Sequence, residues 1–241
     1  MSSCLWERAA LPLTGVAASL FGSLSALRGK RVFHPDGVAY LGRLVFLPEN
    51  QIDPLLRFAA GTSVNAVVRF SRGLGLPQKM PDFLGLAIKL RDLAGPGRDQ
   101  DFLLVTSGEG PIMQQLLMPA RGFFRHHYST VLSYRPSLDG DHILFGAKPG
   151  EELQGWADES FGGIAAAATA GRLRFFFLTA GIGGRWKIAG SLVVTTRIDQ
   201  DAAEGLRFNP WNSHPSLVPA GPLNTWRKSS YEKSQDARPK A

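Results

Sequence analysis

Cysteine is almost absent from this sequence: Cys4 is the only one in 241 residues. A single thiol excludes an internal disulfide framework and any zinc or iron–sulfur site built from several cysteines. It also fits a reducing compartment, so we expect a cytoplasmic protein. Paired-acid motifs and the nucleophile elbow of serine hydrolases are missing too. The glycine clusters at 73–75 and 181–184 are too short for a phosphate-binding loop and predict turns.

Charged residues are few and mostly basic. They make up 20% of the chain, with a formal net charge of +7 and a pI near 9.9. Such a balance is typical of proteins that bind nucleic acid or anionic membranes. Here the basic residues are dispersed, the one dense basic patch is the C-terminal tail, and no nucleic-acid motif is present, so we expect no nucleic-acid partner. The 44% of hydrophobic residues can bury a sizeable core in one domain.

Histidine is also scarce, with five residues in the chain. His126 and His127 are adjacent, but no other histidine or cysteine lies at ligand spacing from them, so we expect no metal site there.

Residues 9–27 form a long uncharged stretch, and Arg8 precedes it. This arrangement is compatible with a signal peptide or a membrane anchor. Its hydrophobicity is weak, however, and Pro12, Gly15 and Gly22 interrupt it. We therefore favour an N-terminal helical segment, residues 1–30, that packs on the domain or on a partner chain, over contact with a membrane.

Short β-branched and aromatic runs bounded by Gly, Pro or Asp predict strands. The runs are Val38–Leu47, Val64–Ser71, Phe83–Leu90, Phe102–Thr106 and His142–Lys148, and a hairpin is expected from Arg172–Ala180 and Arg185–Ile198.

Two stretches have a helical pattern. Apolar residues in Pro111–Leu132 recur at helical spacing, and Glu151–Gly171 predicts an alanine-rich helix. A proline-rich loop, Asn209–Pro222, leads into a terminal helix. Strands, then a helical insert, then strands predict an α+β barrel. No internal repeat or long linker divides residues 31–241, so we expect them to form one domain.

The C-terminal segment places a tyrosine between two arginines. Arg227 precedes Tyr231 by four residues and Arg238 follows it by seven, so the three side chains share one helix face. A nearby guanidinium lowers the pKa of a tyrosine, and a phenolate is a suitable ligand for ferric iron. A solvated helix face gives the same pattern, so this segment alone does not predict a site.

Four further segments precede it in a fixed order. They are RVFHPDGVAY (31–40), VVRFSRGLG (67–75), DFLGLAIKL (82–90) and DFLLVTSG (101–108). Together with the C-terminal Arg-x-x-x-Tyr and its closing Arg, they resemble the core of haem catalases. The resemblance implies an antiparallel β-barrel of the catalase core type, with helical insertions, an N-terminal helix and a C-terminal proximal helix. The chain is short for a catalase and resembles the minimal members of that superfamily, which includes peroxidases and an allene oxide synthase domain.

The resemblance points to three catalytic positions. His34 matches the distal histidine, which takes a proton from the near oxygen of a peroxide and returns it to the far oxygen. Ser71 matches the serine that hydrogen-bonds this histidine. Where the family has a distal asparagine, this chain has Thr106 or Ser107, and a hydroxyl there donates a hydrogen bond with less fixed geometry.

The resemblance also implies haem b as cofactor, with Tyr231 as the axial ligand of the iron. Arg227 would temper the charge of the phenolate. Three arginines match those that bind the haem propionates, and two phenylalanines belong to the same cofactor-binding set. The arginines are Arg31, Arg69 and Arg238, and the phenylalanines are Phe33, which would face the haem, and Phe208, whose spacing to Tyr231 is close to that of the family.

Three functions follow from these assignments. The first is a haem peroxidase that uses a peroxide and a small organic reductant, with weak catalase activity, since the distal asparagine is missing. The second is a haem-dependent fatty-acid hydroperoxide isomerase or dehydratase, which needs no external electron donor. The third is a non-catalytic haem- or lipid-binding protein. Small relatives tend to form dimers, so we expect a homodimer.

Overall fold

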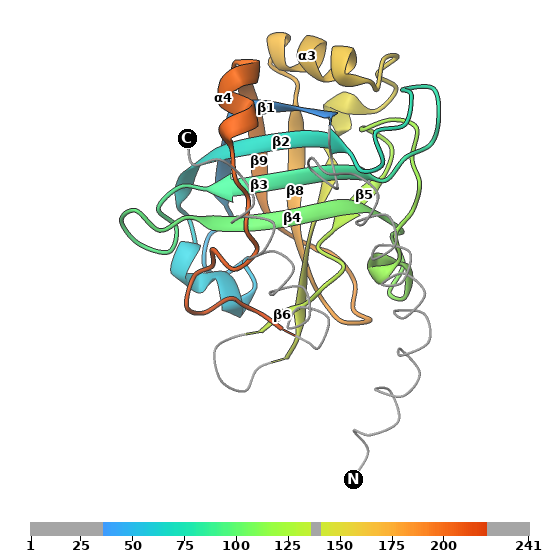
Figure 1. The fold of residues 1–241 in the computed structure, drawn as a ribbon. Coiled ribbons are helices and arrows are strands. Elements are labelled where there is room, and N and C mark those ends of the chain that lie inside the picture. Colours follow the sequence, from blue (N-terminus) through green and yellow to red (C-terminus); the bar gives the residue numbers. More distant parts are fainter. Residues whose placement is uncertain (1–35, 136–140, 221–241) are drawn as a thin grey trace, which may run out of the picture.

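The computed structural model describes residues 36–135 and 141–220, which form a closed β-barrel (Figure 1). Eight strands follow one another around the barrel in the order β7-β5-β4-β3-β2-β1-β9-β8, and β8 pairs with β7 to close it. All pairings are antiparallel, and β6 and β10 extend the sheet from β7. The predicted α+β barrel is confirmed. The predicted N-terminal and C-terminal helices lie outside the described residues.

The strands have the following bounds: β1 Asp36–Phe46, β2 Ser63–Arg72, β3 Leu84–Leu90, β4 Gln100–Ser107, β5 His127–Ser129, β6 Tyr134–Arg135, β7 Ile143–Pro149, β8 Arg174–Gly181, β9 Lys187–Arg197 and β10 Val218–Pro219. The α-helices are α3, Phe161–Thr169, and α4, Gln200–Gly205. The 3-10 helices are η1 Pro54–Ala59, η2 Met113–Gln115 and η3 Glu151–Leu153.

The inner face of the barrel is an aromatic core, because every second residue of each strand points inward. Phe102 on β4 lies 4.6 Å from Phe145 on β7 and 5.2 Å from Phe177 on β8, between ring centroids. Phe70 on β2 contacts Phe175 on β8 at 5.7 Å. These contacts join strands on different sides of the barrel, so its interior is filled by side chains.

Helix α3 packs against this core and lies with α4 at one end of the barrel in Figure 1. The Ser160 hydroxyl caps α3 by accepting a hydrogen bond from the Gly162 N–H at 3.1 Å. Phe161 contacts Phe123 at 5.2 Å, and Phe123 contacts Phe70 at 5.8 Å. The first residue of the helix is thereby tied to the centre of the barrel.

A buried ion pair supports the turn between β2 and β3. Arg72 lies 3.6 Å from Asp82 and donates hydrogen bonds to the carbonyls of Leu76, Pro77 and Met80. Asp82 accepts from the backbone N–H groups of Leu74, Leu76 and Phe83. These hydrogen bonds of both charged groups go to the loop between the two strands, so the pair is structural.

The strand predictions are confirmed, but two helix predictions need correction. Pro111–Leu132 is not a helix; it contains η2, β5 and irregular chain. Its backbone pairs with neighbouring strands through the bridges Ser107↔Leu117 and Asp82↔Ala120, and Pro119 and Gly122 oppose a helix. Glu151–Gly171 is helical only from Phe161, after η3 and an extended stretch.

No helix in the described ranges is both long and apolar enough to span a membrane.

Candidate functional site on the outer face of the barrel

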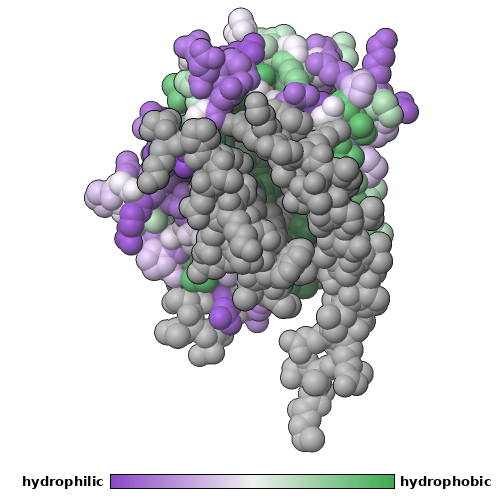
Figure 2. All heavy atoms as spheres, viewed as in Figure 1, coloured by the Kyte–Doolittle hydropathy of each residue, from purple (hydrophilic) through white to green (hydrophobic). Residues whose placement is uncertain are grey.

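The outer surface of β1 to β4 has a composition unlike that of the core. Two rows of laterally paired residues cross these strands, with outward-pointing side chains. One row is Gly37, Ser71, Gly85 and Val105, and the next is Ala39, Arg69, Ala87 and Leu103. We call this surface the outer β1–β4 face. Figure 1 shows β2, β3 and β4 from this side, and the residues visible between the grey atoms at its centre in Figure 2 are hydrophobic.

Arg69 and Ser71 of the predicted site lie on this face together, as the Arg-Phe-Ser pattern requires, with Phe70 pointing into the core. Their lateral neighbours are small residues, two glycines and two alanines. The guanidinium of Arg69 crosses β1, because a Cβ atom placed on Gly37 would lie 2.6 Å from its Nη2 atom. A floor of small residues bordered by a guanidinium therefore lies on the outside of the barrel.

Thr106 does not lie on this face. Its side chain points inward and is fully buried. Its hydroxyl accepts from the Leu84 N–H at 3.1 Å and donates to the Met118 carbonyl at 2.7 Å. The hydroxyl therefore holds the 106–118 loop and its proton is engaged there.

Ser107, the other residue considered for the distal position, points outward. It is 2% exposed, and its hydroxyl has no hydrogen-bond partner within the described residues. A buried polar group without a partner costs free energy, so this hydroxyl is available to a group that binds at the face. Of the two neighbouring hydroxyls, only that of Ser107 is free to donate.

Phe208 lies at the end of the outer β1–β4 face where Lys89 is found. The Nζ atom of Lys89 lies 5.6 Å from the centroid of its ring. Lys89 occupies the row next to Arg69 and Ala87, so the Phe208 ring covers the end of the face away from Ser71. The described residues thus bring Arg69, Ser71 and Phe208 to one side of the barrel.

Asp101 fixes the loop that carries Phe208. Its carboxylate accepts from Lys89 Nζ at 2.8 Å, from the Asn209 N–H at 2.8 Å and from Asn212 Nδ2 at 3.1 Å. Burial raises the pKa of Asp101, and the hydrogen bonds from Lys89, Asn209 and Asn212 act in the opposite direction. Sequence patterns did not reveal this role of Asp101, because Asn209 and Asn212 lie more than a hundred residues away along the chain.

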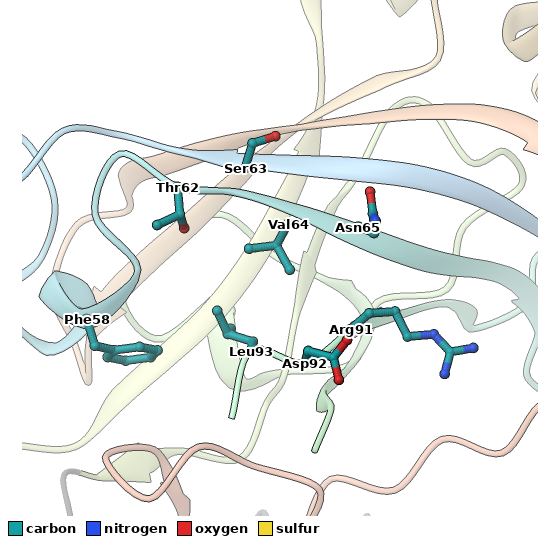
Figure 3. A pocket seen from close by; sticks show the side chains of 8 residues that line it. All are labelled: Phe58, Thr62, Ser63, Val64, Asn65, Arg91, Asp92 and Leu93. Carbon is teal, nitrogen blue, oxygen red and sulfur yellow. The ribbon is translucent and has the colours of Figure 1, made fainter. Parts of the chain in front are cut away.

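A cavity of about 310 Å³ lies elsewhere, at the start of β2 (Figure 3). Phe58 and Leu93 form its apolar side, and Arg91 and Asp92 border it. Asn65, the lining residue of β2 nearest to Ser71 in the sequence, is six positions from it, which is roughly 20 Å along a strand. The cavity is therefore separate from Arg69 and Ser71, and it contains none of the residues predicted from the sequence.

Six predicted site residues lie outside the described residues: Arg31, Phe33, His34, Arg227, Tyr231 and Arg238. Asp36, the first residue of β1, pairs with Arg72, so His34 precedes by two residues the strand that borders Ser71. Within the described residues, no cluster of three or more His, Cys, Asp and Glu side chains can hold a metal ion.

The outer β1–β4 face fits a haem group. A flat ring needs a surface without large side chains, which Gly37, Ala39 and Ala87 provide. A propionate needs a cation, which Arg69 provides, and a ligand of the ring needs a donor, which the orphan hydroxyl of Ser107 provides. These features come from four different strands, β1 to β4, so the fold and not one local motif assembles them.

Comparisons with known proteins support the fold. No family model and no curated protein matches the sequence. A fungal catalase is similar in structure, with a TM-score of 0.67 and 13% identity, over 95% of this chain and 63% of that catalase. Catalase A from Saccharomyces cerevisiae gives a TM-score of 0.66 and 13% identity, over 95% of this chain and 65% of that protein. A bacterial catalase gives 0.63 and 13%, over 95% and 60%. This chain thus spans less than two thirds of each of these catalases, and its fold is catalase-like.

Proposed function

We propose that this protein is a haem b-dependent peroxidase of the catalase-like type, which cleaves hydrogen peroxide or organic hydroperoxides and has weak catalase activity. The observation that carries the proposal is the position of Arg69 and Ser71 on one outer face, beside the small residues of β1 and β3, in a catalase-like fold. The activity of the similar structures belongs to longer chains, so it is a proposal for this one.

The haem would supply an iron that binds a peroxide oxygen and exchanges electrons with it. Tyr231 would bind that iron, and Arg227 would stabilise its phenolate form. Arg31, Arg69 and Arg238 would pair with the two propionates. These assignments give each of the predicted basic residues a defined anionic partner.

His34 would transfer the proton of the peroxide from its near oxygen to its far oxygen, so that the far oxygen leaves as water or an alcohol. Ser71 would orient His34 through a hydrogen bond. We assign the distal donor to Ser107 in place of Thr106, since the Thr106 hydroxyl already donates to Met118. A hydroxyl holds hydrogen peroxide less firmly than an amide, which favours reduction by an organic donor over disproportionation.

Absorption spectroscopy tests the cofactor assignment. The protein purified from cells supplied with a porphyrin precursor should bind haem stoichiometrically and show a Soret band. Tyr231→Phe should lose or shift that band, and His142→Phe, which changes a histidine in the strand region around β7, should keep it. A colourless wild-type protein would contradict the proposal.

Kinetics test the reaction. His34→Ala should retain haem and lose roughly 10²- to 10⁴-fold in peroxide turnover, the range expected for loss of a general acid–base group. Turnover should require an organic reductant. Conversion of a fatty-acid hydroperoxide without consumption of any reductant would instead identify an isomerase or dehydratase, and full turnover by His34→Ala would rule out the assigned proton transfer.

A further inference from the structure

Two loops carry the most exposed large hydrophobic side chains in the described part of the chain. One loop is residues 110–118, which include η2, and the other is residues 181–188, where β8 turns into β9. Ile112 is 77% exposed in the first loop and Ile182 is 54% exposed in the second. Met113, Met118 and Ile188 are exposed as well. Hydrophobic side chains gathered in this way, and not scattered singly, indicate a contact surface.

A hydrogen bond joins the two loops. The buried side chain of Gln114 donates from Nε2 to the Gly181 carbonyl at 3.3 Å. Ile112 and Met113 directly precede Gln114, and Ile182 directly follows Gly181. The exposed hydrophobic side chains of both loops therefore lie around one buried contact. We call residues 110–118 and 181–188 the two-loop surface.

The β8–β9 loop is held in place by its own contacts. The Gly184 N–H donates to the Gly181 carbonyl at 2.8 Å, which closes a four-residue turn with Ile182 at its corner. The Trp186 ring lies on β7, because a Cβ atom placed on Gly146 would be 2.9 Å from its Cζ3 and Cη2 atoms. The loop lies at the end of β8 away from α3 (Figure 1). Ile182 is thus presented to solvent by an ordered turn.

The charges of the two-loop surface are positive. Loop 110–118 contains no charged residue, and loop 181–188 contains two exposed cations, Arg185 and Lys187, and no acid. Two acids border the surface. Glu109 lies 3.0 Å from Nδ1 of His127, and Asp141 precedes the residue whose carbonyl accepts from the Ile182 N–H. The surface itself combines apolar side chains with cations, the combination that suits an interface between acyl chains and anionic headgroups.

We propose that the two-loop surface docks on a lipid bilayer that contains anionic lipids. Ile112 and Ile182 would enter the acyl-chain boundary, and Arg185 and Lys187 would lie at the level of the lipid phosphates. The formal net charge of +7 attracts the whole protein to such a bilayer. A second copy of the chain would bring like charges together, and a nucleic acid backbone would offer the isoleucines no apolar partner.

The two-loop surface continues to the proposed peroxide site. Leu117, in the first loop, forms a β-bridge with Ser107, the proposed distal donor. A docked protein would therefore receive hydroperoxides carried by membrane lipids beside this residue. This choice of substrate rests on the proposed function, whereas the docking itself does not.

Sedimentation with vesicles tests the docking. The protein should bind vesicles of equal parts phosphatidylcholine and phosphatidylserine, and bind phosphatidylcholine vesicles more weakly. Ile112→Ser and Ile182→Ser should each weaken binding roughly 10-fold, because each removes a buried hydrophobic side chain from the complex. Arg185→Gln should weaken it roughly 5-fold and make it less sensitive to salt.

Two control variants match these changes in exposure and chemistry. Leu41→Ser changes a side chain that is 48% exposed on β1, and Arg172→Gln removes an exposed cation just before β8, at its other end. Both should leave vesicle binding nearly unchanged. Absence of vesicle binding by the wild type, or equal binding by Ile182→Ser and Leu41→Ser, would overturn the proposal.

A polarity-sensitive dye tests which residues enter the bilayer. Cys4 is the single cysteine of the chain, so Cys4→Ser with Ile182→Cys gives one labelling site. Vesicles should shift the emission of a dye at this position to the blue, and should not shift that of a dye at Arg172→Cys in the same background. Equal shifts at the two positions would contradict insertion of the β8–β9 loop. Self-association without vesicles that Ile182→Ser abolishes would instead assign the surface to a second copy.

The docking and the peroxidase fail in different ways. A protein that binds no haem and still docks through these loops would overturn the peroxidase alone. In the haem-loaded protein, phosphatidylcholine hydroperoxide in vesicles and tert-butyl hydroperoxide in solution can be compared. The ratio of the first turnover to the second should fall in Ile182→Ser and stay constant in Leu41→Ser. An unchanged ratio in Ile182→Ser would overturn the delivery of substrate from the bilayer.

Discussion

The inner and outer faces of β1 to β4 are built from alternate residues of the same strands, yet they differ in size and chemistry. Phe70 and Phe102 point inward into an aromatic core, whereas their neighbours Arg69 and Asp101 point outward and carry charge. The inner face holds large side chains that pack against each other. The outer face combines small residues with a few polar groups. Along each strand, the residues that stabilise the core therefore alternate with the residues of the proposed site. Substitutions at adjacent positions can test the two roles separately.

The largest effect is expected in the core. Phe102→Ala should lower the free energy of unfolding by about 3–5 kcal/mol, because it removes a ring that contacts Phe145 and Phe177. Leu103→Ala, at the adjacent outward position, should cost about 1 kcal/mol, since its side chain is only half-buried. Urea denaturation measures both. Equal losses at the two positions would show that the faces do not differ in this way.

Asp101 should give the next largest loss. Asp101→Asn breaks a buried ion pair and leaves Lys89 with Asp99 alone, 3.6 Å away, so we expect a loss of about 3 kcal/mol. The loop from Asn209 to Asn212 should become sensitive to limited proteolysis, because Asp101 accepts hydrogen bonds from both residues. Asp99→Asn is the matched control, with an expected loss of about 0–1 kcal/mol. If this loop still resisted proteolysis in Asp101→Asn, Asp101 would not be the residue that fixes it.

The substitution Gly37→Ala tests whether the outer face needs its small residues. A Cβ atom there would lie 2.6 Å from Arg69 and 2.7 Å from the Phe70 carbonyl, so Gly37→Ala must shift both strand and guanidinium. We expect a loss of about 1–2 kcal/mol in unfolding free energy and weaker haem binding by titration. At Gly205 an added Cβ meets no atom within 4 Å, so Gly205→Ala serves as the control. Unaltered haem affinity in Gly37→Ala would place the cofactor elsewhere.

The smallest effect concerns His214, which stacks on Phe58 with ring centroids 3.8 Å apart. Burial lowers the pKa of His214 below its ordinary value of 6.5, and Arg98 adds to this. The unfolded chain therefore binds a proton more readily, and stability should fall as the pH drops below about 6.5. His214→Phe keeps an aromatic ring at this position without titrating, so it should flatten this part of the pH dependence. Urea denaturation at pH 5.5 and pH 7.5 would reveal an unchanged slope if His214 did not contribute.

Local patterns predicted the strands well because alternation and turn residues act over short distances. Val64–Ser71 and Phe83–Leu90 coincide closely with β2 and β3, and the hairpin around residues 181–184 is also confirmed. The helix predicted for Pro111–Leu132 is wrong, because the backbone there forms bridges to Asp82, just before β3, and to Ser107 at the end of β4. The short helix α4 was not predicted.

For the candidate site too, the sequence predicted what depends on neighbouring residues and not what depends on strand pairing. The Arg-Phe-Ser pattern correctly places Arg69 and Ser71 on one face, since residues two apart in a strand share a face. The choice between Thr106 and Ser107 depended on a register that the sequence does not display. The contact of the Glu109 Oε1 atom with the His127 Nδ1 atom, at 3.0 Å, was not predicted, because eighteen positions separate the two residues in the sequence and only the pairing of β4 with β5 brings them together. The roles of His34 and Tyr231 remain predictions.

The two-residue strand β10 forms a free border of the sheet in the described part of the chain. Its second residue is Pro219, which has no N–H group to donate to an incoming strand. The long strands β7 and β8 pair with each other, so their edges are already hydrogen-bonded. An exposed edge strand can pair with a strand of another copy of the protein, which leads to aggregation and fibrils. In the described part of the chain, almost no unpaired strand edge is available for pairing with another molecule. A concentrated solution of the folded protein should therefore resist the formation of fibrils.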